Sequence, residues 1–61
     1  MNSYLAISIL EGIVESSYED QVDALQHLAN TGEAWTLPGR IGRAVADAAR
    51  AGIIEVRRAT R

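Results

Sequence analysis

A length of 61 residues and the absence of cysteine together limit what this chain can fold into. A domain of this size buries only about 60% of the surface of its unfolded chain, and it usually needs disulfides, a metal or partner subunits for stability. Disulfides and thiolate metal sites are excluded here. The apolar fraction of 48% is ordinary for a globular protein and too high for a disordered one. We therefore expect a single domain that forms a homo-oligomer.

The apolar residues recur with a helical period of 3.6, which predicts an all-α, compact three-helix domain. The helices are expected at about residues 3–15, 17–30 and 38–51. Ser16–Glu19 and Ser17–Asp20 both have capping-box spacing, and Gly32 and Gly52 suit helix C-termini. Residues 53–56 alternate weakly and can form one short extended strand. The domain is expected to cover residues 1–56, and residues 57–61 form a flexible basic tail.

The first helix carries an apolar arc of roughly 200°, about twice what a surface helix needs. Either this helix is central and packs between the other two, or part of the arc binds a partner. Tyr4 and Ser8 lie on its polar side, and Tyr18 is expected in the core. The third helix has a flank of very small residues that lets another helix approach closely. The predicted oligomer or partner interface comprises Ile7, Ile9, Leu10, Gly42, Ala46 and Ala49.

Charge is strongly polarised along the chain although the net charge is only −2. Six acidic residues and no basic residue precede Pro38, and all six arginines follow Pro38. Arg40, Arg43 and Arg50 share one face of the third helix, where Asp47 is expected to neutralise Arg43 at i, i+4. This polarity is compatible with a ligand site and equally with self-assembly.

The best candidate site lies where the third helix begins. A nucleotide-like ligand can stack on Trp35 while its phosphates meet the free N–H groups near Gly39 and the guanidinium groups of Arg40 and Arg43. The alternative is that Trp35 and Leu37 fill the core beneath this corner and the arginines are solvated.

Other candidate sites are weaker. Asp20, Asp23 and His27 share one helix face, but a solvated polar face explains them better than a metal site. His27 has no serine nucleophile or partner acid fixed near it in the sequence. We therefore predict no enzyme activity, no metal and no cofactor. No signal peptide precedes the apolar run 4–10, which is too short to span a membrane, so we expect a cytoplasmic protein without membrane contact.

Segments 18–22 (Tyr-Glu-Asp-Gln-Val) and 31–43 (Thr-Gly-Glu-Ala-Trp-Thr-Leu-Pro-Gly-Arg-Ile-Gly-Arg) resemble a family of short, uncharacterised tailed-bacteriophage proteins. The family core is Thr-Gly-x-Ala-Trp-x-Leu-x-Gly-x-x-Gly-Arg, and the likeness extends over roughly residues 4–54. This chain departs from it at Pro38 and at Arg40-Ile41. The resemblance implies a viral protein acting in the cytoplasm of an infected bacterium. Small helical phage proteins of this kind act by binding, as sponges for immune signals or as inhibitors of host enzymes.

Together these features predict a small non-enzymatic binding protein. The leading hypothesis is an anti-defence factor that sequesters an anionic nucleotide-derived signal in pockets of a homo-oligomer. The alternative is an inhibitor that docks on a host protein through the apolar face of the first helix. A helix-turn-helix DNA-binding protein ranks third, because the acidic half would meet a polyanion badly.

Overall fold

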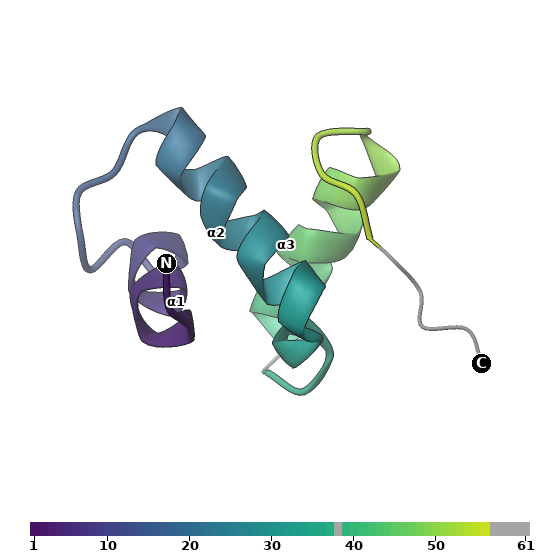
Figure 1. Cartoon of the computed structure of the whole chain (residues 1–61), viewed down its shortest axis with the longest axis horizontal. Coiled ribbons are helices and arrows are strands. Elements are labelled where there is room, and N and C mark those ends of the chain that lie inside the picture. The colour runs from purple at the N-terminus through teal and green to yellow at the C-terminus, as the bar shows by residue number, and fades with distance from the viewer. Residues whose placement is uncertain (38, 57–61) are drawn as a thin grey trace.

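The computed structural model describes residues 1–37 and 39–56, which fold into three α-helices and one 3-10 turn (Figure 1). The elements are α1 (Ser3–Leu10), α2 (Tyr18–Thr31), the 3-10 turn η1 (Glu33–Trp35) and α3 (Gly39–Arg50). These residues contain no strand, so the all-α three-helix prediction is confirmed. The predicted helix start at Pro38 and the predicted tail 57–61 lie outside the described residues.

The ends of α2 are fixed by local hydrogen bonds that the sequence predicted. The Asp20 N–H donates to Ser17 Oγ (3.1 Å) and the Ser17 N–H donates to Asp20 Oδ2 (3.2 Å), which completes a capping box. Of the two capping boxes that the sequence predicted, the one that begins at Ser17 is therefore the one that forms. At the other end Gly32 adopts φ +81°, and its N–H donates to the Leu28 carbonyl (3.1 Å).

The first helix ends five residues before the predicted boundary at residue 15. Gly12 adopts φ +79°, and the Ile13 N–H donates to the Ser8 carbonyl (3.0 Å), as in a Schellman motif. The apolar period continues through Gly12, which concealed this stop. As a result Ile13 is 75% exposed, whereas Ser8, predicted on the polar side, is buried.

The segment after α3 does not form the predicted strand. Gly52 has φ +80° and the Ile53 N–H donates to the Ala48 carbonyl (2.9 Å), so the helix ends in the same Schellman motif as α1. The Gln26 side chain then holds the following backbone: its Oε1 accepts from the Glu55 N–H (3.0 Å) and its Nε2 donates to the Glu55 carbonyl (2.6 Å). One side-chain amide thus provides the hydrogen bonds that a neighbouring strand would provide.

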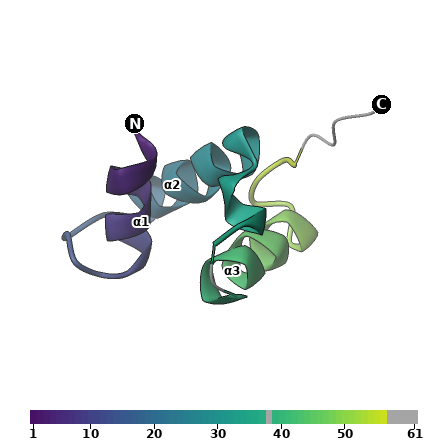
Figure 2. The ribbon, with the colours of Figure 1, turned by 90° about the horizontal axis from the view of Figure 1, so that it is seen from below.

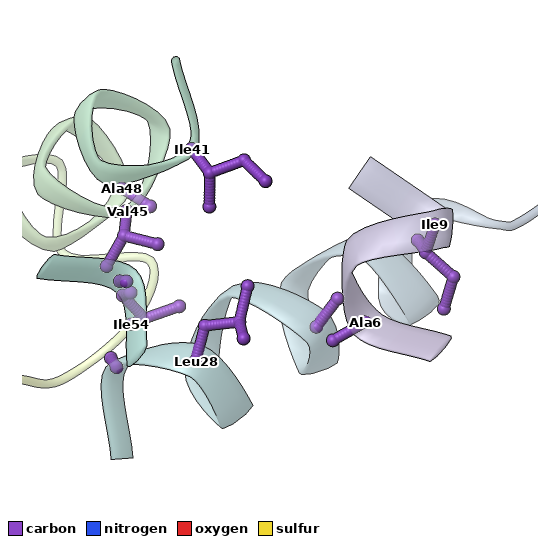
Figure 3. Packing of buried hydrophobic residues seen from close by; sticks show 10 residues of the cluster. Ala6, Ile9, Leu28, Ile41, Val45, Ala48 and Ile54 are labelled. Atoms are coloured by element: carbon purple, nitrogen blue, oxygen red, sulfur yellow. The ribbon is translucent and has the colours of Figure 1, made fainter. Parts of the chain in front are cut away.

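The central helix is α2, with α1 packed on one side of it and α3 on the other (Figures 1 and 2). Leu28 is fully buried and lies between Ala6 of α1 and Val45 of α3 (Figure 3). The interpretation of the first helix as the central one is therefore wrong. The prediction that Tyr18 is buried is also wrong, since Tyr18 is 67% exposed. The core consists of Ala6, Ile9, Ala24, Leu28, Ala29, Ala34, Ile41, Val45, Ala48 and Ile54.

A search of the described residues for a helix with the length and hydropathy of a membrane span finds none.

Candidate ligand-binding site

The 3-10 turn that follows Gly32 decides how Trp35 is presented. The Trp35 N–H donates to the Gly32 carbonyl (3.2 Å), and both the Thr36 N–H (3.0 Å) and the Thr36 Oγ1 (2.9 Å) donate to the Glu33 carbonyl. The turn buries Ala34 completely and leaves Trp35 52% exposed. The alternative that Trp35 and Leu37 both fill the core is therefore wrong for Trp35, whereas Leu37 does pack against the core.

The helix α3 approaches this turn very closely at Gly42. A Cβ atom on Gly42 would lie 3.0 Å from the carbonyl oxygen of Ala34, tighter than most real Cβ contacts. Only a glycine allows this distance without a shift of the backbone. The small residue thus serves a contact within the chain, between α3 and η1.

An open pocket of about 340 Å³ lies between η1 and the first turns of α3. Trp35 and Leu37 supply apolar surface, and the Arg43 guanidinium supplies charge. Arg43 reaches back along the helix, since its Nη2 lies 3.6 Å from the position of a Cβ on Gly39. The residues that line the pocket are Ala34, Trp35, Leu37, Gly39, Gly42 and Arg43.

Three of the four predicted ligand-binding residues therefore lie together: Trp35, Gly39 and Arg43. The fourth, Arg40, is exposed in the first turn of α3 but does not line the pocket. The pairing of Asp47 with Arg43 was predicted wrongly. In the described residues Asp47 Oδ1 contacts Arg50 Nη1 at 3.3 Å, at i, i+3. Arg43 therefore carries its positive charge at the pocket without a carboxylate of α3 against it.

None of the six predicted interface residues is fully exposed; each is buried or partly buried within its own chain. Ile9 is only 6% exposed and contributes to the chain's own core. Ile7 and Leu10 are partly buried against that core, and Ala49 packs there as well. The exposed apolar side chains of the N-terminal end are instead Met1, Tyr4, Leu5, Ile13, Val14 and Tyr18.

The chain was compared with protein families, curated proteins and solved structures, and nothing matches. The resemblance to tailed-phage proteins thus stays a prediction.

A polar cluster that the sequence did not predict joins α1, α2 and η1. Ser3 Oγ donates to Glu33 Oε1 and lies 3.3 Å from His27 Nε2, while Thr31 Oγ1 donates to the same Glu33 oxygen (2.9 Å). The hydrogen bond from Ser3 lowers the pKa of Glu33 most, followed by that from Thr31 and by the charge of His27. The expectation that no serine lies near His27 is therefore wrong. Ser3 is 24 residues from His27 and 30 from Glu33, so no local pattern could reveal the cluster.

The direction of these hydrogen bonds does not suit nucleophilic catalysis. Ser3 has one hydroxyl hydrogen and gives it to Glu33, whereas a serine nucleophile would direct this hydrogen at the nitrogen of its base. The cluster instead fastens the start of α1 to the turn that presents Trp35. In the described residues no three His, Cys, Asp or Glu side chains are grouped to hold a metal, including those of Asp20, Asp23 and His27.

Proposed function

We propose that this protein binds, without transforming it, a small anionic ligand that carries a planar ring, of the nucleotide-derived class. The observation that supports this best is the half-exposed Trp35 beside the Arg43 guanidinium in one pocket. A base can stack on the indole, since stacking on aromatic side chains is worth about 1–3 kcal/mol per base. A phosphate is favoured by the guanidinium and by the positive end of the helix dipole.

The pocket is wide open to solvent and has room for a ligand of about one nucleotide unit. Its volume of about 340 Å³ lies at the lower end of the range of roughly 300–1,000 Å³ that is usual for small-molecule sites. The described lining residues belong to η1, to the residue Leu37 and to α3, and we propose that each copy of the chain in a homo-oligomer carries such a pocket. An anti-defence role in an infected bacterium is the biological setting that we propose for this binding.

The helical arrangement offers less to the DNA-binding alternative. A helix-turn-helix joins its two helices by a turn of about three or four residues. Here seven positions, residues 32–38, separate the end of α2 from the start of α3. The acidic side chains Glu19, Asp20 and Asp23 on α2 would also repel a polyanion.

A thermal-shift measurement with cyclic nucleotides and ADP-ribose derivatives tests the proposal. At a hundredfold excess over Kd a ligand stabilises the fold by about 2.7 kcal/mol, and in a domain of this size each kcal/mol moves Tm by about 4–8 °C. We expect one ligand class to raise Tm by more than about 10 °C. Trp35→Ala and Arg43→Gln should remove the shift. Arg50→Gln, on the same helix but paired with Asp47, should keep it. A panel that leaves Tm unchanged refutes the proposal.

A further inference from the structure

The N-terminal end of the molecule exposes several large apolar side chains. We define this end by Tyr4 and Leu5 of α1, Ile13 and Val14 of the following connection, and Tyr18 at the start of α2. The two tyrosines are 82% and 67% exposed. Aromatic side chains are enriched at protein interfaces, where they contribute much of the apolar contact.

The charged side chains around this end are all acidic. Glu11, Glu15 and Glu19 are exposed beside the apolar side chains, and no Lys or Arg occurs anywhere before Arg40. Two such ends packed against each other would bring carboxylates together, which opposes association. A suitable partner must therefore present cations around an apolar contact.

The opposite side of the same molecule has that character. Arg40 and Arg43 are exposed on α3, next to the half-exposed Trp35. The helix α2 lies between α1 and α3, so α1 and α3 lie on different sides of the molecule (Figures 1 and 2). Among the described residues no ion pair joins the two surfaces; Asp47 and Arg50 pair with each other within α3. Both surfaces thus keep their charge available for a neighbour.

We propose that the N-terminal end of one copy docks on the α3 surface of a second copy, with Ile13 and Tyr18 against the apolar edge near Trp35 and Glu19 near Arg40. A standard interface takes about 800 Å² from each partner, so we expect the acidic rim to take part in the contact together with the apolar side chains. The contact is heterologous, because different surfaces meet. It closes into a ring or extends as a filament according to the rotation between neighbours. This inference concerns assembly and does not depend on the proposed ligand, although an anion on Arg43 competes with the neighbour's carboxylates.

Complementation between two variants tests the contact with the whole chain. Ile13→Asp disables the N-terminal end, and Arg40→Glu disables the α3 surface without touching the pocket lining. Light scattering should show association of the wild type and at least tenfold weaker association of each variant alone. An equimolar mixture should give a dimer with one copy of each variant by native mass spectrometry, because each retains the surface that the other lacks. Circular dichroism confirms that both variants fold.

Ile53→Asp is a matched control, since Ile53 follows α3 in the same Schellman motif in which Ile13 follows α1. It should associate like the wild type. A wild type that stays monomeric at millimolar concentration overturns the inference, and would mean that the surface binds another molecule. Arg40→Glu associating like the wild type while Ile13→Asp does not also overturns it, and would mean that two N-terminal ends pack together. The inference is likewise overturned if the variant mixture gives no mixed dimer, or if Ile53→Asp disrupts association as much as Ile13→Asp.

Discussion

The close contact between Gly42 and the Ala34 carbonyl gives a prediction whose sign opposes helix propensity. In an exposed helix interior, Gly→Ala stabilises by about 1 kcal/mol. At Gly42 the new Cβ would lie 3.0 Å from a backbone oxygen, which cannot turn aside as a side chain can. Overpacking of this kind costs about 1–3 kcal/mol. We expect Gly42→Ala to destabilise the fold by about 1 kcal/mol, which lowers Tm by about 4–8 °C.

Gly39→Ala is the control, because its Cβ would meet only the end of the Arg43 side chain at an ordinary 3.6 Å. This variant should be neutral or slightly stabilising. Urea unfolding of both variants, followed by circular dichroism, measures the difference. If Gly42→Ala were stabilised as much as Gly39→Ala, the close approach of α3 to η1 would be refuted, and with it the wall of the pocket.

Three further changes test the fold around the site. Leu28→Ala should lower the free energy of unfolding by about 3–5 kcal/mol, which is most of the stability of a domain this small. Circular dichroism should therefore show a largely unfolded chain. Ser17→Ala removes the cap of α2 and should cost about 1 kcal/mol by urea unfolding, whereas an unchanged midpoint would contradict the capping box. The lowered pKa of Glu33 means that its carboxylate stabilises the fold above pH 4.5, and that this contribution disappears as the pH falls through the lowered pKa. As the pH is lowered below 4.5, the urea midpoint should therefore fall less steeply in Glu33→Gln than in the wild type. If the midpoints of the two proteins fell equally steeply, this would contradict the hydrogen bond from Ser3.

Local sequence signals predicted the positions of the helices better than the way in which the helices pack. The capping box at Ser17 and the glycines after α2 and α3 act within a few residues, so their effect could be found in the sequence. Gly12 acts in the same way, but the apolar residues on both sides of it suggested a continuous helix. The apolar pattern therefore predicted a helix correctly but placed its C-terminal end too late.

Features that depend on distant contacts could not be predicted. The burial of Ser8, the exposure of Tyr18 and the central place of α2 follow from how the helices pack, and helical periodicity carries no information on that. The strand that residues 53–56 could form is absent because the described residues contain no second strand to pair with it, and Gln26 holds this backbone instead. For the same reason the contact of Ser3 with His27 and Glu33 was missed.

The candidate site was predicted in part because its residues are close in sequence. Trp35, Gly39 and Arg43 span nine positions, and one 3-10 turn followed by one helix brings them together. The direction of Trp35 was left open, since the pattern allowed both a buried and an exposed indole. The ion pair of Asp47 was assigned to the wrong arginine, because i, i+3 and i, i+4 partners are both within reach on a helix.

The binding proposal can be tested most directly through Trp35, the single tryptophan of the chain. Its fluorescence reports on the pocket that it lines. Titration with cyclic nucleotides and ADP-ribose derivatives should give saturable quenching by one ligand class at one site per chain, lost in Arg43→Gln and retained in Arg50→Gln. Fluorescence that no ligand changes, or quenching that Arg43→Gln retains, would contradict the binding of an anionic ligand at this site.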